Sequence, residues 1–527
     1  MKYYIFRNST VELFFNEFNC EFSEYGDFLN FDDKFDRYIF FYNLLNKTDS
    51  NLIAKEIEQY KNNLDFILSK LPPNKTFIIF TIEKTIKLNF DYSDNLIDKL
   101  IFDFNLYLFK LQKKITNVKV ISISNFYEKY SLKDRINWKY YFLSNIELNP
   151  SYLKDFAKWI KNQIRSIELK RKKCIVLDLD NTLWGGILGE DGIDGIQIGN
   201  SYPGNAFLFF QKALLELKNN GVLLTVCSKN NQDDVFELWK NHSDIILRKK
   251  DFTIHKINWK DKADNIIEIS NELNIGLDSM IFIDDNPTER EFVKKIIPDV
   301  IVPNFPEEPY LLPEFFNEIL ENYFSVHTLT KEDLDKSVQY ENNISRNVFK
   351  EKFSDINKFI SELEIVLSIE ELDDSNISRF AQMTQKTNQF NLTTRRYTDI
   401  EINSFRNKGL VYGLRVKDKF GDNGITGLIM ININQKEATI DSFLLSCRIL
   451  GKRIEFEFMK YIILTLKDMG VNILKAKFIK TRKNIQTENF FEKLKFQVIK
   501  HTQEEKHYTL DLNKNTFKLS PKIYKFI

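Results

Sequence analysis

Residues 174–183 read Cys-Ile-Val-Leu-Asp-Leu-Asp-Asn-Thr-Leu, and this stretch decides the fold. Its run of four apolar residues predicts a strand that is buried on both faces, and the polar residues from Asp178 onward mark the end of that strand. Residues 222–230 and 279–286 repeat the pattern of an apolar run followed by polar side chains. Segments with helical periodicity separate the three runs, around 206–219, 231–241 and 261–274. The rhythm predicts a doubly wound parallel sheet over about 170–305.

Acidic residues follow two of these predicted strands. Asp178 and Asp180 come after the first, and Asp284 and Asp285 come after the third. In an open α/β sheet the active crevice lies outside the carboxyl ends of the strands, so these four carboxylates are expected to meet there. Crowded carboxylates repel one another unless a cation or a shared proton compensates. Oxygen ligands without a His or Cys cluster favour magnesium, so we predict a Mg²⁺ site with these four residues as ligands.

The same acidic residues suit phosphoryl chemistry. A carboxylate such as Asp178 that faces a phosphate can act as a nucleophile and form an aspartyl-phosphate. Asp180 can then protonate the leaving oxygen and later activate water. Only residues 184–227 separate the first two polar runs, which leaves no room for a large cap domain. We therefore expect an open site that can accept a group carried on a large partner.

The motif after the first strand resembles a known family. Residues 178–186, Asp-Leu-Asp-Asn-Thr-Leu-Trp-Gly-Gly, resemble motif I of the haloacid dehalogenase (HAD) superfamily phosphotransferases, and the Trp-Gly-Gly continuation resembles their FkbH-like branch in subfamily IIIC. The resemblance implies that Thr182 and Ser228 bind the phosphate. It also implies that Lys262 is the cation that balances phosphate and carboxylate, and that Asp284 and Asp285 are metal ligands.

Further segments of the chain resemble FkbH-like proteins, so that the resemblance spans about 135–500. These segments are residues 137–141, 382–397, 420–427 and 446–453. The last one, Ser-Cys-Arg-Ile-Leu-Gly-Lys-Arg, partly resembles the phosphate loop of the GNAT acyltransferase fold. This implies a pantetheine site that includes Arg448 and Gly451. Because Arg453 replaces the small residue expected in that loop, we expect the phosphopantetheine arm of a carrier protein rather than free coenzyme A.

FkbH-like proteins load a glyceryl group from 1,3-bisphosphoglycerate onto an acyl carrier protein and remove the phosphate. Acyl transfer to a pantetheine thiol commonly passes through a cysteine thioester. Cys227, next to Ser228, is the first candidate for that cysteine, and Cys447 in the pantetheine segment is the second. Cys174 lies roughly 13 Å before Asp178 along the strand, which is too far. Cys20 has no supporting context.

The fold class expected for the whole chain is α/β with three domains. An N-terminal α/β domain covers 1–165, with strands at 77–80 and 118–123 and a helix over 96–114. FkbH-like proteins often carry an SGNH-hydrolase-like domain at this place. We find no Ser/His pair in residues 1–165 that would make the domain catalytic. The HAD-like domain covers 166–325. An α+β GNAT-like domain covers 326–527. Its first part, up to about 350, is expected to be a mostly helical connector. Asp422-Asn423-Gly424 predicts a hairpin turn there, before a strand over 425–433.

Composition narrows the class of protein. The 75 basic and 74 acidic side chains leave a net charge of +1, which argues against a nucleic-acid-binding protein. Four cysteines in 527 residues do not build a disulfide framework, so we expect a reducing, cytoplasmic location. No apolar stretch reaches the length of a membrane-spanning helix.

Two other functions are compatible with the sequence. One is a phosphatase without a cap, acting on a phosphorylated sugar or polyol precursor of a surface polysaccharide. The other is a non-enzymatic docking module for a carrier-bound pathway. The intact acid pairs argue against the docking module, because a scaffold would not require them.

Overall fold

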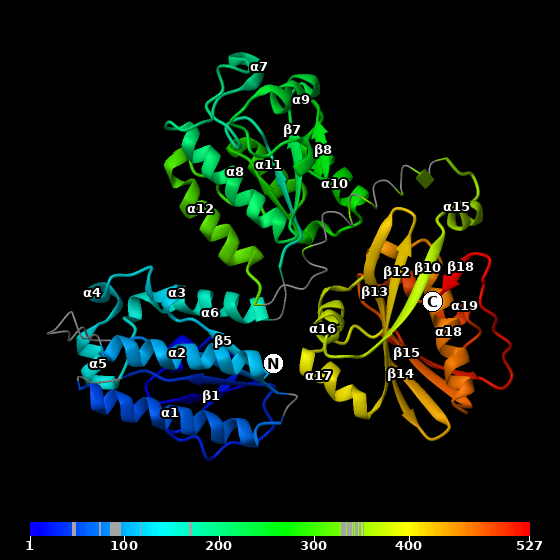
Figure 1. Cartoon of the computed structure of the whole chain (residues 1–527), viewed down its shortest axis with the longest axis horizontal. Helices are drawn as coiled ribbons and strands as arrows, with labels where there is room; N and C mark the ends of the chain where they lie inside the picture. The colour runs from blue at the N-terminus through cyan, green and yellow to red at the C-terminus, as the bar shows by residue number, and fades with distance from the viewer. Residues whose placement is uncertain are drawn as a thin grey trace. The chain divides into compact units, whose positions relative to one another are not determined.

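The computed structural model describes residues 1–527 apart from 45–48, 73–74, 85–95, 116, 168–170, 328–333, 335–339, 341, 343–345, 347–348 and 351. Its contacts divide the chain into two compact units, residues 1–168 with 397–404, and residues 169–396 with 405–527. The first unit contains one sheet and the second contains two (Figure 1). One sheet lies in each of the three expected domains, whose boundaries stay predictions.

The first unit is built on a parallel sheet of order β2-β1-β3-β4-β5. Alternate residues of its strands face two different cores, as the period of two requires. Helices α1 and α2 cover one face and α6 covers the other. The bounds are β1 (Tyr3–Arg7), β2 (Cys20–Phe22), β3 (Arg37–Phe41), α1 (Ser50–Lys70), β4 (Thr76–Phe80), α2 (Leu96–Lys114), β5 (Val118–Ile121), α3 (Ser124–Tyr127), α4 (Leu132–Arg135), α5 (Trp138–Ser144) and α6 (Leu153–Ile167). Both expected strands and the expected helix are confirmed.

The sheet that follows in the chain is parallel, with the order β8-β7-β6-β9. Its strands are β6 (Cys174–Leu177), β7 (Leu223–Ser228), β8 (Ile254–Ile257) and β9 (Met280–Ile283). Strand order runs outward from β6 in one direction and to β9 in the other, so the topological switch point lies between β6 and β9. The three expected strands are confirmed. Strand β8 was not predicted from the sequence, because its central residues, His255 and Lys256, are polar and half-buried at the edge of the sheet.

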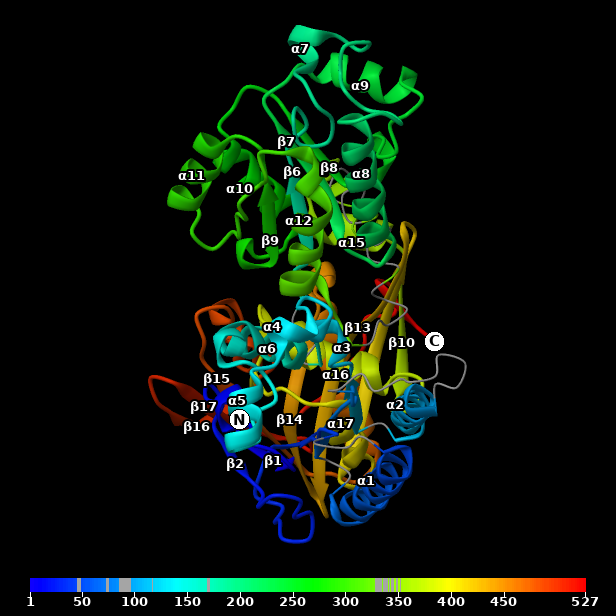
Figure 2. The same ribbon diagram turned by 90° about the vertical axis from the view of Figure 1, so that its left-hand side faces the viewer.

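Helices cover both faces of this sheet. Helices α8 (Gly204–Asn219), α9 (Gln232–Asn241) and α12 (Leu312–Ile319) pack on one face, and α10 (Lys262–Leu273) and α11 (Pro287–Ile296) on the other (Figure 2). The layers explain why β6 is apolar throughout, since each of its residues faces a helix layer. Between β6 and α8 the chain forms only the short helix α7 (Leu188–Asp191), so this segment holds no cap domain, as its length predicted.

Gly204, the first residue of α8, allows a test of how tightly this domain is packed. A Cβ on Gly204 would lie 2.8 Å from the backbone nitrogen of Gly199 and 2.9 Å from the backbone of Ile198. Gly204→Ala should lower the free energy of unfolding by about 1–3 kcal/mol, because backbone must move to relieve the overlap. Gly189→Ala is the matched control, since a Cβ there meets nothing within 4 Å. Urea denaturation of both variants checks the prediction, and equal losses would contradict it.

The C-terminal sheet has the order β16-β17-β15-β14-β13-β12-β10-β18, with β11 paired to β14. Helix α18 (Ile454–Asp468) packs against it in a large apolar core. Strands β14 and β15 pair in parallel over only three residues each, and β11 pairs with the other end of β14. The strand bounds are β10 (Ile365–Glu371), β11 (Phe390–Asn391), β12 (Gly409–Asp418), β13 (Gly421–Asn434), β14 (Glu437–Leu445), β15 (Ile473–Ile479), β16 (Gln497–His501), β17 (Glu505–Asp511) and β18 (Tyr524–Phe526). The other helices of this part are α15 (Ile356–Glu362), α16 (Ile377–Lys386) and α19 (Phe490–Lys493), whereas α17 (Asp399–Ser404) belongs to the first unit.

The predicted hairpin turn at 422–424 is wrong in position. The turn joins β12 to β13 at residues 419–420, since Asp418 pairs with Gly421. Gly424 does adopt a positive φ of 67°, but inside β13, where the pairing with β12 shifts register. Gly424 is therefore part of a β-bulge and not of the hairpin turn.

Most of the expected helical connector, up to about residue 350, lies outside the described residues. Among the helices that are described, none has the length and apolar character needed to cross a membrane.

Candidate active site

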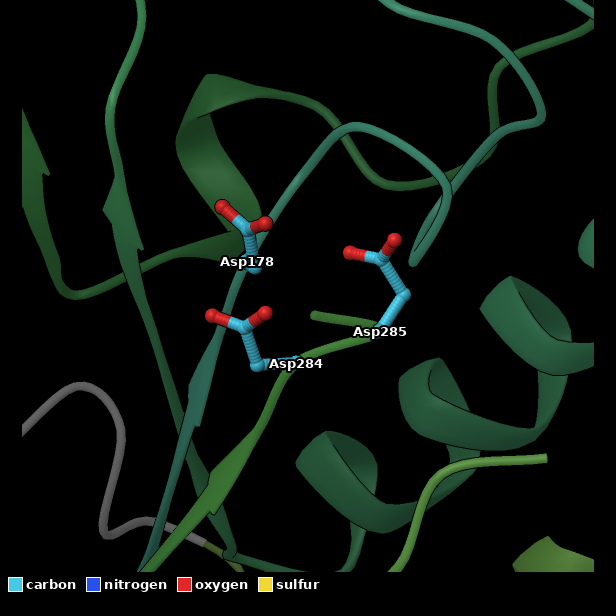
Figure 3. Close-up of side chains that lie close together, drawn as sticks. All are labelled: Asp178, Asp284 and Asp285. Carbon is cyan, nitrogen blue, oxygen red and sulfur yellow. The ribbon is translucent and has the colours of Figure 1, made fainter. Parts of the chain in front are cut away.

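Three carboxylates converge at the switch point of the β6–β9 sheet. Asp178 follows β6 directly, and Asp284 and Asp285 follow β9 (Figure 3). The Asp178 amide donates to the Ile283 carbonyl at 3.0 Å, which fixes the two strand ends side by side. One oxygen of each carboxylate lies within 4.8 Å of the others. The fold thus brings together three of the four acids that the sequence singled out.

Asp284 and Asp285 are held in an environment that opposes their charge. Burial, followed by the charge of Asp178, raises the pKa of Asp284 to about 7 and that of Asp285 to about 6. Asp284 is fully buried. A cation between these groups would offset both shifts, because it favours the ionised carboxylates.

Lys262 supplies one cation from the first turn of α10. Its Nζ lies 2.6 Å from Asp284 Oδ2 and 3.1 Å from Asp178 Oδ2. Burial alone would lower the pKa of this ammonium, but the two carboxylates raise it well above its ordinary value. Lys262 therefore stays charged and bridges Asp178 to Asp284, and its role as the cation that balances phosphate and carboxylate stays a prediction.

A second cation would complete the charge balance. The other oxygen of Asp178, Oδ1, is buried and accepts no hydrogen bond from the described residues. An unpartnered buried carboxylate oxygen is costly, and a metal ion held with Asp284 and Asp285 would satisfy it. An all-oxygen donor set of this kind fits a hard divalent cation such as Mg²⁺.

Asp180 lies on the loop that leaves β6, and its carboxylate is not part of this cluster. Its Oδ1 accepts from Trp184 Nε1 at 3.0 Å and from the Leu188 amide at 3.1 Å, and its Oδ2 accepts from Asn230 Nδ2 at 2.9 Å. The carboxylate of Asp180 thus lies outside the group of three that approach one another, and its role as a metal ligand stays a prediction. Burial raises the pKa of Asp180, which suits an acid that must carry a proton.

Trp184 orients Asp180, and this gives a testable effect. The indole is fully buried, so its N–H bond to Asp180 is shielded from water. Trp184→Phe should lower kcat for phosphate release about tenfold and leave KM nearly unchanged, because a hydrogen bond to a charged group contributes about 1.5–3 kcal/mol. Steady-state kinetics checks whether kcat falls while KM stays unchanged. Trp259→Phe, at an exposed indole of the same domain, is the control. A change confined to KM would contradict the positioning role.

The two hydroxyls assigned to the phosphate differ in their surroundings. Thr182 is fully buried, and its Oγ1 accepts from the Asp285 amide at 3.2 Å, so it joins the β6 loop to the β9 loop. Ser228 is the last residue of β7, the strand next to β6, and is therefore at the same end of the sheet as Asp178. Its role as a phosphate ligand stays a prediction.

A cavity of about 340 Å³ adjoins Asp285. Asn181, Asp285, Arg290 and Glu307 form its polar wall, and Phe207 and Phe305 belong to its apolar wall. Arg290 donates to the backbone carbonyls of Asp284 and Asp285, which fixes the loop after β9. Neither Arg290 nor Phe305 belonged to a sequence motif. Both lie well outside the strand ends that carried the sequence signal.

Cys227 does not meet the requirements of a nucleophile. Its side chain is fully buried among apolar residues of the α10 layer, and its Sγ contacts the Lys262 carbonyl at 3.7 Å. Burial raises the pKa of this thiol further above its ordinary value, which disfavours the reactive thiolate. Successive strand residues face opposite sides, so Ser228 and Cys227 cannot both face the crevice.

The two residues expected to bind pantetheine lie together at a smaller cavity of about 90 Å³. Arg448 and Gly451 line it together with Arg346, Lys350 and Lys452. The sequence signal for Lys452 was its place in the segment 446–453, whereas nothing in the sequence linked Arg346 or Lys350 to that segment.

Comparison with solved structures finds an extensive similarity to a phosphatase structure. The N-terminal part of the protein BF1531 from Bacteroides fragilis, which contains a phosphatase domain and is complexed with Mg, is 26% identical and superposes with a TM-score of 0.56. The match covers 62% of this chain and 95% of that chain. The expected α/β fold class is confirmed, and the phosphatase part of the resemblance is supported.

Shorter similarities concern acetyltransferases. The ribosomal-protein-S18-alanine N-acetyltransferase from Escherichia coli is 13% identical, with a TM-score of 0.23, and the match covers 29% of this chain and 99% of that one. A Bacillus subtilis acetyltransferase in complex with CoA is 12% identical, with a TM-score of 0.22 over 28% of this chain and 98% of that one. Scores this low carry no argument about function. No family model matches the chain. No curated protein matches it either.

Proposed function

We propose that this chain is a Mg²⁺-dependent phosphatase and acyltransferase of the HAD type. Its donor would be a phosphorylated three-carbon acyl compound, 1,3-bisphosphoglycerate, and its acceptor the phosphopantetheine thiol of an acyl carrier protein. The observation that carries the phosphatase part is the cluster of Asp178, Asp284 and Asp285 around the unpartnered oxygen of Asp178, with Lys262 at its side. The glyceryl donor and the carrier protein rest on the resemblance to FkbH-like proteins.

The carboxylate cluster, Lys262 and the neighbouring Asp180 have different roles in phosphate removal. Asp178 attacks the phosphorus atom, the bond to the ester oxygen breaks, and an aspartyl-phosphate forms. Asp180 gives its proton to the departing oxygen and then takes one from the water that hydrolyses the aspartyl-phosphate. Lys262 offsets the negative charge that gathers near Asp178. Asp178, Asp284 and Asp285 would hold Mg²⁺, which supplies further charge stabilisation to the phosphoryl group.

The open cleft fits a substrate delivered by a large partner. No cap lies between β6 and α8, and the cavity beside Asp285 is therefore not enclosed by an inserted domain. Open sites of this kind can receive a phosphorylated group on the end of a long carrier arm. This supports a carrier protein as the partner over a small free sugar phosphate.

Intact-mass measurement tests the proposal. The protein is incubated with Mg²⁺, 1,3-bisphosphoglycerate and a holo carrier protein, and the masses of both proteins and the released phosphate are followed. The expected product is a carrier protein that bears a glyceryl group without phosphate. Phosphate release without any modified carrier would support only a phosphatase. The absence of both released phosphate and modified carrier would refute the proposal.

A further inference from the structure

Helix α2 of the first unit has an apolar face that points to solvent. Phe102, Leu106 and Phe109 are 65%, 39% and 38% exposed. Because they are spaced by four and then three residues, these side chains lie on one side of the helix, and together they form the α2 stripe. Single exposed apolar residues are ordinary on a protein surface, but an aligned row of them indicates a surface that binds a partner.

The α2 stripe is separate from the two sides of the helix that are already packed. One side lies in the core that α1 and α2 form with the sheet, through the buried residues Ile101, Phe104 and Leu108. Another side faces α1, beside which α2 lies (Figure 1), and Tyr107 Oη donates to Asp65 Oδ1 of that helix at 3.3 Å. Since successive residues are turned by about 100°, the stripe points roughly 130° away from each of these sides. A helix with apolar residues beyond its core face is typical of one that packs against a further element.

The charges of α2 are divided between its two ends. Its charged residues are, in chain order, Asp98, Lys99, Asp103, Lys110, Lys113 and Lys114. The first three belong to the amino-terminal half, where acids outnumber bases, and the last three make the carboxyl-terminal half basic. Two such helices packed in parallel would bring their basic halves together, whereas antiparallel helices place each basic half against an acidic one. The charge pattern is therefore complementary to itself in the antiparallel arrangement.

The apolar residues are complementary in the same arrangement. In an antiparallel pair whose two-fold axis passes between Asn105 and Leu106, Phe102 of each copy meets Phe109 of the other, because the two lie equally far from the axis. Asp98 lies opposite Lys113 of the other copy for the same reason. Each of these contacts is made twice, as a closed two-fold interface requires.

We infer that α2 binds a second copy of this chain, and that the two copies pack their α2 stripes against each other in antiparallel orientation. Helix α2 has 19 residues and is therefore about 28 Å long. One helix pair of this length lies at the lower end of the size of specific interfaces, so the dimer is reversible and forms at micromolar concentrations. All residues of the interface belong to the first unit, so the inference is independent of the proposed function.

Sedimentation velocity of the full chain over about 1–100 µM tests the inference. We expect the mean mass to rise from that of one chain to that of two. Phe102→Ser and Phe109→Ser should each raise the dissociation constant of the dimer about tenfold or more, because each removes an aromatic side chain from the centre of the interface. Phe142→Ser is the matched control and should leave the dimer unchanged, since Phe142 of α5 is 70% exposed but lies outside the stripe.

Two results of this measurement would overturn the inference. One is a single chain at every concentration of the unaltered protein, a result that does not depend on how the variants fold. The other is a dimer that Phe102→Ser and Phe109→Ser leave unchanged, because that dimer would use another surface.

Exchange of charges tests the antiparallel orientation. Lys113→Glu places an acid opposite Asp98 of the other copy and should weaken the dimer about tenfold. Adding Asp98→Lys to the same chain restores opposite charges at both places, so the dissociation constant should return to within about threefold of its original value. Asp98 also pairs with Lys84 of its own chain, but a partly exposed pair of this kind contributes little. A double variant that dimerises as weakly as Lys113→Glu would contradict the inferred interface.

A membrane surface is the alternative occupant of the stripe, since an aromatic row beside basic residues also suits anionic lipid. Flotation with vesicles of phosphatidylcholine and phosphatidylglycerol separates the two cases. The unaltered protein should remain in the aqueous fraction. Flotation with the vesicles that is lost in Phe102→Ser and retained in Phe142→Ser would assign the stripe to lipid and overturn the inference.

Discussion

Asp178→Asn is expected to lower Mg²⁺-dependent phosphate release by roughly 10³-fold or more, the scale on which loss of a covalent nucleophile acts. Asparagine keeps the shape of the side chain but cannot form an aspartyl-phosphate. It also removes a charge that raises the pKa of Asp284 and Asp285, so the thermal unfolding midpoint should not fall. A loss of activity without a loss of stability would identify a chemical role.

The matched control is Asp233→Asn in the first turn of α9. Asp233 is exposed and lies in the same sheet domain, outside the carboxylate cluster. Its replacement should leave phosphate release unchanged. Trapping with a phosphate analogue such as beryllium fluoride adds a second measurement, because the unaltered protein should be stabilised by it and Asp178→Asn should not. Phosphate release that survives in Asp178→Asn would place the chemistry elsewhere.

Lys262→Met is expected to have the second-largest effect, and it acts on stability as well as activity. The ammonium is buried between Asp178 and Asp284, so its removal leaves two buried carboxylates without their cation. Breaking a buried ion pair from one side costs about 3–5 kcal/mol, so the urea midpoint measured without metal should fall markedly. Added Mg²⁺ should restore part of the stability, because it offsets the same charges. Phosphate release should fall at least tenfold.

Lys256→Met is the control for this variant. Lys256 also pairs with two acids, Glu268 and Glu272, but at the surface of the same domain, at 2.8 and 2.5 Å. Exposed pairs contribute about 0–1 kcal/mol, so this change should have little effect. Equal destabilisation by the two substitutions would show that the position of Lys262 between the carboxylates is not what matters.

The carboxylate cluster could be predicted because its signal is local. Asp178, Asp284 and Asp285 each follow an apolar run, and parallel strands bring their carboxyl ends to one edge. The contribution of Lys262 came from the family resemblance. Asp180 was expected beside the other acids, but its carboxylate lies outside their cluster and accepts from Trp184, Leu188 and Asn230. Spacing along a strand does not show which way a side chain turns once the strand has ended, since the loop that follows has no fixed period.

The cysteines show a different limit. Cys227 adjoins Ser228 in the sequence, yet the alternation of a strand sends it into the apolar layer under α10. Cys447 was the second candidate, and its surroundings come from Tyr340, Arg346 and Asn274, which lie about 100 residues or more before it in the chain. No periodicity links such distant segments, so the sequence could not indicate two cavities at this thiol.

The sequence by itself determined the α/β class, the strands β6, β7 and β9, and the acids at their ends, because burial on both faces leaves a continuous apolar run. Tertiary structure decided which of those acids meet at one point, which cysteine reaches a cavity, and which cations line the small cavity at Arg448. The physical reason is that burial and backbone hydrogen bonding act over a few residues and leave a pattern in the chain. Charge crowding and cavity formation depend on which distant segments pack together, and that packing is decided only when the sheets and helices are assembled.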